Sequence, residues 1–164
     1  MTAPLIHIGY NKAASTWLQK RFFKNPKTGF QWTRKGPGTG VTALASARPL
    51  EFSVEKSRAI FAAELESARA KGLTPVVSLE RLAGHPFSGG FDSKELAHRL
   101  TGVFPGARFL AVFREQKSMI VSTFKQYVKA GGTSSLERFI DPPRHRHVRL
   151  PQFDLHHFEY LLRV

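Results

Sequence analysis

The chain has 164 residues, of which 41% are hydrophobic and 12% aromatic. This composition predicts one domain with a real core, and it argues against a disordered basic tail or a multidomain enzyme. The chain holds 25 Lys and Arg but only 12 Asp and Glu, a formal net charge of +13. It contains no cysteine, which excludes disulfides, zinc–thiolate sites and cysteine nucleophiles. An anionic ligand is therefore expected: nucleic acid, a membrane surface, a phosphorylated cofactor or an acidic polysaccharide.

The apolar runs of the chain are short. The longest, such as residues 109–113, are far below the roughly 20 residues of a spanning helix. Residues 1–9 also lack the basic region and the long apolar region of a signal peptide. We therefore expect a soluble, cytoplasmic protein without a membrane span.

The first half of the chain alternates extended and helical patterns. An apolar run over residues 5–9 predicts a strand, and aromatic and leucine side chains at helical spacing predict a helix over residues 15–23. Residues 25–49 are rich in Gly, Pro and Thr, which predicts an irregular connection with a short strand near residues 30–33. This connection is a candidate cover for a substrate. A helix follows over residues 54–71, capped by Ser53 and ended by Gly72.

The second half repeats this alternation. Residues 74–80 predict a strand, residues 83–91 a loop, and Asp92 with Glu95 predicts a capping box that starts a helix ending at Pro105-Gly106. Residues 108–114 form the clearest buried strand, and a helix then runs to Gly131-Gly132. The alternation predicts an α/β fold with three layers (αβα), a central parallel sheet, and ligand sites at the carboxyl ends of its strands.

The first chemical motif is the segment HIGYNKAASTWL at residues 7–18. A strand leads into a helix through a loop, so the loop amides and the helix N-terminus form an anion cradle, and Lys12 adds a positive charge. The segment is not a Walker A motif, because Lys12 precedes Ser15 by three residues instead of lying next to a hydroxyl residue. The alternative is that Ser15 only caps the helix and Lys12 is an ordinary loop lysine.

The second motif is RFLAVFREQKSMIVS at residues 108–122. Arg114 at a strand end and Ser122 two turns into the next helix can approach one phosphate from two directions. Lys125 and Lys129 extend the same helix face. The alternative is a surface arginine beside a solvated helix face.

Together the two motifs resemble the sulfotransferases that use 3′-phosphoadenosine 5′-phosphosulfate (PAPS). That family has a first loop of the type Gly-x-x-Lys-x-Gly-Ser/Thr-Ser/Thr-x-Leu and a later Arg and Ser eight residues apart. The residues that match are Gly9, Lys12, Ser15, Thr16 and Leu18 in the loop, and Arg114 and Ser122 in the second motif. Two residues depart from the pattern: Ala14 replaces a loop glycine, which a negative φ would permit, and Gln116 replaces a frequent proline.

The resemblance implies a P-loop-like loop that binds the 5′-phosphosulfate of PAPS, with no metal. The loop residues assigned to this cofactor are Gly9, Asn11, Lys12, Ala13, Ala14, Ser15 and Thr16. Arg114 and Ser122 are assigned to the 3′-phosphate, and Lys12 to catalysis as well. We choose Glu80 as the catalytic base because it ends a strand on the expected ligand side, the alternative being an ion pair with Arg81 or another surface cation.

The resemblance leaves several points open. Family members are generally longer, so residues 1–164 are expected to form a single sulfotransferase-like domain that is incomplete at its C-terminal end. The acceptor is a small molecule or a carbohydrate with a hydroxyl or amine, nucleic acid is not the expected partner, and the oligomeric state is open. Two alternatives remain: a non-catalytic nucleic-acid or polyanion-binding α/β module, and a nucleotide kinase with a degenerate phosphate loop.

Overall fold

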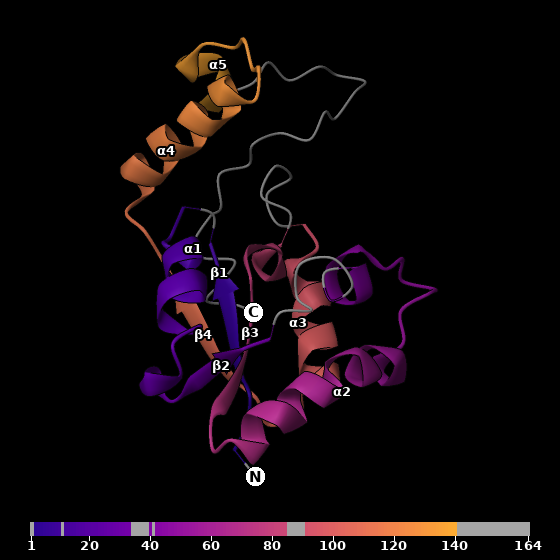
Figure 1. Cartoon of the computed structure of the whole chain (residues 1–164). Helices are drawn as coiled ribbons and strands as arrows, with labels where there is room; N and C mark the ends of the chain where they lie inside the picture. Colours follow the sequence, from indigo (N-terminus) through magenta and orange to yellow (C-terminus); the bar gives the residue numbers. More distant parts are fainter. Residues whose placement is uncertain (1, 11, 34–39, 41, 85–90, 141–164) are drawn as a thin grey trace.

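The centre of the molecule is a four-stranded parallel sheet (Figure 1). In the computed structural model, residues 2–10, 12–33, 40, 42–84 and 91–140 are described. The strands are β1 (Leu5–Gly9), β2 (Phe30–Trp32), β3 (Thr74–Leu79) and β4 (Arg108–Val112). Their order is β2-β3-β1-β4, so β1 pairs with β3 on one side and with β4 on the other.

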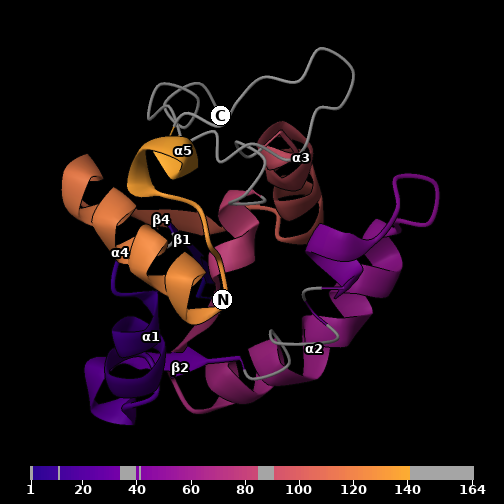
Figure 2. The ribbon, with the colours of Figure 1, turned by 90° about the horizontal axis from the view of Figure 1, so that it is seen from above.

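Helical segments cover both faces of this sheet. Successive β1 side chains point to opposite faces: Ile6 packs into the core beside Phe61 of α2, whereas His7 contacts Phe23 at the end of η1. Figure 2 shows the same separation, with α2 and α3 on one side of the strands and α1 on the other. One side is formed by α2 (Val54–Ala70) and α3 (Ser93–Val103). The other side is formed by α1 (Ser15–Trp17) and the π-helix η1 (Leu18–Phe22). The predicted three-layer α/β architecture is confirmed.

Further helical elements lie in the described chain, α4 being the longest of them. They are two 3-10 helices, η2 (Pro26–Thr28) and η5 (Glu80–Ala83), a π-helix, η4 (Thr42–Ser46), and the helices α4 (Gln116–Lys129) and α5 (Leu136–Ile140). In Figure 1, α4 and α5 extend beyond the carboxyl ends of the strands. No helix in the described ranges combines the length and the apolar character needed to cross a bilayer.

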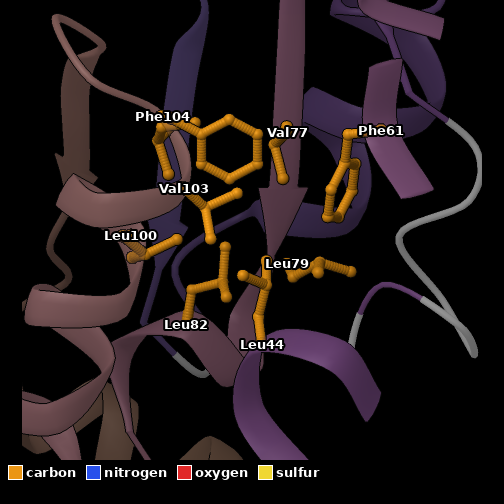
Figure 3. Close-up of a cluster of buried hydrophobic side chains, with 9 residues drawn as sticks. Leu44, Phe61, Val77, Leu79, Leu82, Leu100, Val103 and Phe104 are labelled. Carbon is orange, nitrogen blue, oxygen red and sulfur yellow. The ribbon is translucent and has the colours of Figure 1, made fainter. Parts of the chain in front are cut away.

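The main core lies between the sheet and the α2–α3 layer (Figure 3). Phe61 and Phe104 meet edge to face, with ring centroids 5.2 Å apart. The buried members of this cluster are Ile6, Leu44, Phe61, Val77, Leu79, Leu82, Leu100, Val103 and Phe104. Burying these side chains is the largest favourable contribution to folding, and it holds β1 and β3 in register beneath the candidate site.

Helix α2 begins and ends as its sequence predicts, but α3 does not begin with the expected capping box. Ser53 accepts a hydrogen bond from the Lys56 amide, and Gly72 beyond the C-terminus has a φ of 70°. Asp92 stands at the N-cap of α3 but makes no side-chain cap bond, because its carboxylate pairs with Arg81. The prediction of a capping box is therefore wrong. The Asp92 carboxylate pairs with the distant Arg81 instead of accepting a hydrogen bond from an amide at the start of α3.

Two strand ends differ from the prediction in ways that affect the site. β3 ends at Leu79, so Glu80 is the first residue of η5 rather than the last of the strand. β4 ends at Val112, so Arg114 lies in the connection to α4. The prediction that this is a buried strand is wrong: Arg108 and Phe109 are exposed and the rest of β4 is half-buried, because β4 lies at the edge of the described sheet. The strand predicted near residues 30–33 is present as β2. Residues 85–90 of the predicted loop at 83–91, and residues 141–164, lie outside the described residues.

Candidate functional site

A pocket of about 630 Å³ lies at the carboxyl ends of β1 and β4 and beside the start of η5. Its lining comprises Lys12, Ala13, Ala14, Ser15, Thr16, Glu80, Val112, Phe113, Arg114 and Gln126. Four stretches of the sequence meet here: the loop after β1 with the start of α1, the start of η5, the end of β4 with its connection to α4, and Gln126 within α4. The structure thus brings the loop lysine, the candidate base and the candidate phosphate-binding arginine to one pocket.

The loop after β1 is held in a strained conformation. Lys12 has a φ of 65° and Ala14 a φ of 61°, in the left-handed region that side chains with a Cβ disfavour. Ala13 lies between them, only 4% exposed, in a small cluster with Tyr10 and Ala83. Burial of this methyl group fixes the middle of the loop, and the strain falls on the two flanking residues.

The conformation of Ala14 corrects one expectation. A negative φ was the condition under which alanine could replace glycine there without strain, but φ is positive. Ala14 is also the N-cap of α1 and offers no side-chain cap bond. The alternative that Ser15 only caps this helix is therefore wrong, since Ser15 is the first residue inside it.

Gly9 is required by the way the loop folds back. A Cβ at this position would lie 2.2 Å from Ser15 Oγ and 3.1 Å from His7 Cε1. The Ser15 side chain is 1% exposed, and its hydroxyl donates a long hydrogen bond of 3.5 Å to the carbonyl of Tyr10. The glycine thus lets the first turn of α1 sit directly against the end of β1.

The first amides of α1 are free to bind a ligand. Among the described residues, no hydrogen bond joins the amides of Ala14, Ser15 or Thr16 to an acceptor. The Lys12 side chain makes no ion pair within the same part of the chain. Unsatisfied amides beside a cation form an anion-binding surface at this wall of the pocket.

Arg114 connects the loop to α4. Its NH1 donates to the carbonyl of Lys12 at 3.3 Å, and its Nε donates to Ser118 Oγ at 3.1 Å. The sequence analysis paired Arg114 with Ser122 and gave Ser118, on the same helix face, no role, although its spacing of four residues from Arg114 is a signal for such a contact. Arg114 also lines a second pocket, so it stands where the two pockets meet.

The second pocket, of about 480 Å³, follows one face of α4. It is lined by Arg114, Glu115, Lys117, Ser118, Val121, Ser122 and Lys125. Ser122 shares this pocket with Arg114 but does not line the first one. The predicted pair therefore faces a common space, one that adjoins the pocket of Lys12.

The start of α4 explains how Gln116 replaces a proline. Gln116 is the first residue of the helix, a position where proline is favoured for its fixed φ but is not required. Glu115 supplies the cap instead, accepting from the amides of Lys117 and Ser118 at 2.8 Å each. These two amide hydrogen bonds lower the pKa of the Glu115 carboxyl below its ordinary value.

Glu80 lies in the first pocket as an exposed side chain at the start of η5. Its alternative, an ion pair with Arg81 or another surface cation, is not found among the described residues, and Arg81 pairs with Asp92 instead. Asn11, the remaining loop residue assigned to the cofactor, lies outside the described residues. Within those residues no three His, Asp or Glu side chains gather in a way that could hold a metal ion.

A buried hydrogen-bond network lies beneath the loop. His7 is fully buried, and its Nδ1 lies 2.7 Å from Ser78 Oγ. Gln19 Nε2 donates to the same hydroxyl at 3.1 Å and to the Ser78 carbonyl at 3.2 Å. Burial lowers the pKa of the His7 imidazole from 6.5 to about 4, so the ring is neutral near pH 7. The network ties β1, β3 and η1 together, and it makes His7 a core residue rather than a candidate base.

Comparisons of the chain with protein-family models, with curated proteins and with solved structures found no match in any of the three.

The strain at Ala14 predicts that Ala14→Gly stabilises the protein. Glycine removes a left-handed penalty of about 1–2 kcal/mol at the cost of some backbone entropy, for a net gain of roughly 0.5–1 kcal/mol. Denaturant unfolding measures this change. The matched control is Ala97→Gly inside α3, which should lose about 1 kcal/mol. A loss at Ala14 similar to that at Ala97 would contradict the strained loop.

The burial of His7 predicts a specific loss of stability in acid. The unfolded chain takes up a proton at His7 near pH 6.5, whereas the folded chain resists protonation until about pH 4. The free energy of unfolding therefore falls as the pH drops through this window, by roughly 2.5 kcal/mol at pH 4.5. Unfolding at pH 7 and pH 4.5 should show a smaller acid loss in His7→Gln than in the wild type. An unchanged pH dependence would refute the neutral, buried imidazole.

Proposed function

We propose that this protein is a sulfotransferase that moves a sulfuryl group from PAPS to a hydroxyl or amine acceptor. One observation carries the proposal: a single pocket at the strand ends is lined by the strained Lys12 loop, Glu80 and Arg114. This adds a spatial argument to the sequence resemblance, because the three groups come from positions up to about a hundred residues apart in the chain.

The residues present fit the 5′ end of the donor. The free amides of Ala14, Ser15 and Thr16 and the Lys12 ammonium would hold the 5′-phosphosulfate. The buried Ser15 hydroxyl would act mainly by shaping the loop, and the exposed Thr16 hydroxyl can face the ligand. When bound, PAPS supplies the sulfuryl group and a bisphosphate leaving group.

The second pocket fits the 3′-phosphate. Its cations are Arg114, Lys117 and Lys125, and its one carboxylate is Glu115, which leaves two net positive charges. A phosphate monoester carries a charge of about −1.5 to −2 near pH 7, so the pocket and the phosphate are complementary. Ser122 adds a hydroxyl on the same helix face. A nucleotide with anionic groups at both ends can therefore engage both pockets across Arg114.

The roles of the two catalytic residues follow from their charges. Glu80 would take the proton from the acceptor oxygen or nitrogen as the new bond to sulfur forms. Lys12 would stabilise the negative charge that grows on the bridging oxygen as the bond from sulfur to the leaving phosphate breaks. The loop amides and Arg114 would hold the reacting groups in line.

Nucleotide binding separates this proposal from the alternatives. A sulfotransferase should bind 3′-phosphoadenosine 5′-phosphate (PAP) more tightly than ATP, whereas a kinase with a degenerate phosphate loop should prefer ATP. A polyanion-binding module should show no preference for the 3′-phosphate. Calorimetry with PAP, ATP and AMP makes this comparison, and tighter binding of ATP than of PAP would overturn the proposal.

Arg114→Ala should weaken PAP about ten- to hundredfold, since one charge-assisted contact of about 1.5–3 kcal/mol is lost. The same change should weaken AMP, which lacks the 3′-phosphate, much less. Lys129→Ala provides the control, because Lys129 lies on α4 outside the second pocket. Equal losses for PAP and AMP would remove Arg114 from the 3′-phosphate site.

Glu80→Gln and Lys12→Ala should separate the two catalytic roles. Both changes should lower turnover, Lys12→Ala by roughly a hundredfold or more because a contact to developing charge is worth about 2.7–4 kcal/mol. Only Lys12→Ala should also weaken PAP, since the Glu80 carboxylate repels an anionic nucleotide rather than binding it. Transfer of radiolabelled sulfate and calorimetry give the two readouts. Wild-type turnover in Glu80→Gln would leave the base unidentified.

A further inference from the structure

The positive charge of the chain is concentrated near its N-terminus. Residues 1–50 contain eight Lys and Arg and no Asp or Glu, so they supply eight of the thirteen net positive charges. The first acidic residue is Glu51. Because no carboxylate of this segment can neutralise its cations, their field extends into solvent.

The structure places four of these cations on one stretch beside an exposed tryptophan. Lys20, Arg21, Lys24 and Lys27 are exposed on η1, on the turn after it and on η2, and none makes an ion pair with another described residue. Trp17 is 58% exposed, and its ring stacks on Phe22 with centroids 6.4 Å apart and planes 23° apart. We name Trp17, Lys20, Arg21, Lys24 and Lys27 the η1 surface.

The η1 surface begins at the first pocket and extends away from it. Thr16 lines the pocket, and Trp17 is the next residue. Residues 17–24 span about 10 Å along a helical path, so Lys24 lies well beyond the pocket. In Figure 1, this segment descends from α1 along the sheet, away from the strand ends. A ligand that contacts both the pocket and Lys24 must be longer than a small phenol or amine.

We propose that the acceptor is an acidic polysaccharide that lies on the η1 surface and presents one hydroxyl to Glu80. This inference rests on the proposed function. Repeated carboxylate or sulfate groups along such a polymer would pair with the four cations, none of which makes an ion pair with a described acid. The apolar face of a sugar ring would pack on the exposed Trp17 indole, which has an apolar body and a polar edge.

The composition of the η1 surface favours a polysaccharide over nucleic acid. Sites for single-stranded nucleic acid usually present several aromatic rings for successive bases. The η1 surface exposes one such ring, because Phe22 is half-buried beneath Trp17 and Phe23 is buried. Its four cations instead lie within eight consecutive residues, 20–27. Closely spaced cations suit a polymer whose acidic groups are also closely spaced.

The test measures binding of chondroitin sulfate by the full chain through the fluorescence of Trp17. Trp32→Phe leaves Trp17 as the sole tryptophan, since the chain contains two. Chondroitin sulfate should change its emission, and neutral dextran should not. In this background, Arg21→Gln with Lys24→Gln should weaken chondroitin sulfate at least tenfold and reduce the salt dependence of binding, because fewer counterions are released.

The control is Lys56→Gln with Lys94→Gln, which removes two exposed lysines from α2 and α3 on the other face of the sheet. It should weaken chondroitin sulfate less than threefold. Equal losses of chondroitin sulfate affinity in the two double variants would overturn the proposal. Tighter binding of an oligothymidylate of about 20 nucleotides than of chondroitin sulfate would also overturn it. Calorimetry with PAP separates the two hypotheses: Arg21→Gln with Lys24→Gln should keep wild-type PAP affinity. A wild-type chain that binds chondroitin sulfate but not PAP would refute the sulfotransferase and retain the polysaccharide surface.

Discussion

The candidate site depends on the close approach of Ser15 to Gly9. The chain leaves β1, turns within five residues and returns so closely that a Cβ on Gly9 would overlap Ser15 Oγ. This contact places the first amides of α1 over the end of β1. It also leaves little freedom for the residues between, which explains why Ala13 is buried and why Lys12 and Ala14 take left-handed φ values. The strain is local, and it keeps the amides of Ala14, Ser15 and Thr16 without hydrogen-bond acceptors among the described residues.

Arg114 extends this loop into a larger site. The Arg114 guanidinium donates hydrogen bonds both to the carbonyl of Lys12 and to Ser118 near the start of α4. Helix α4 lies beyond the carboxyl ends of the strands (Figure 1). Helix α4 contributes to both pockets, through Gln126 in the first and Ser122 in the second, and Arg114 lines both. Arg114 still has N–H groups beyond those two bonds, because a guanidinium carries five. The same side chain can therefore organise the site and contact a ligand.

The sequence predicted the strands, the parallel sheet and the meeting of Lys12, Glu80 and Arg114 at one edge, because these follow from hydrophobic pattern and from the rule that ligand sites lie at strand ends. Prediction from the sequence failed where the conformation of a residue depends on a partner that is distant in the chain. Asp92 has the spacing of a cap, yet Arg81 takes its carboxylate. The φ of Ala14 follows from the packing of Ala13 against Ala83, about seventy residues away. The link from His7 to Ser78 and Gln19 joins three elements whose proximity no local pattern reveals.

The strand order has a consequence for the time course of folding. β1 is complete by Gly9, but its two partners, β3 and β4, begin at Thr74 and Arg108. During synthesis, one edge of β1 is therefore unpaired until β3 is made and the other until β4 is made. Contacts between such distant segments slow folding, because a long loop must close before any pairing is gained. The net positive charge of residues 1–50 would keep this segment from associating with other chains before its partners are made.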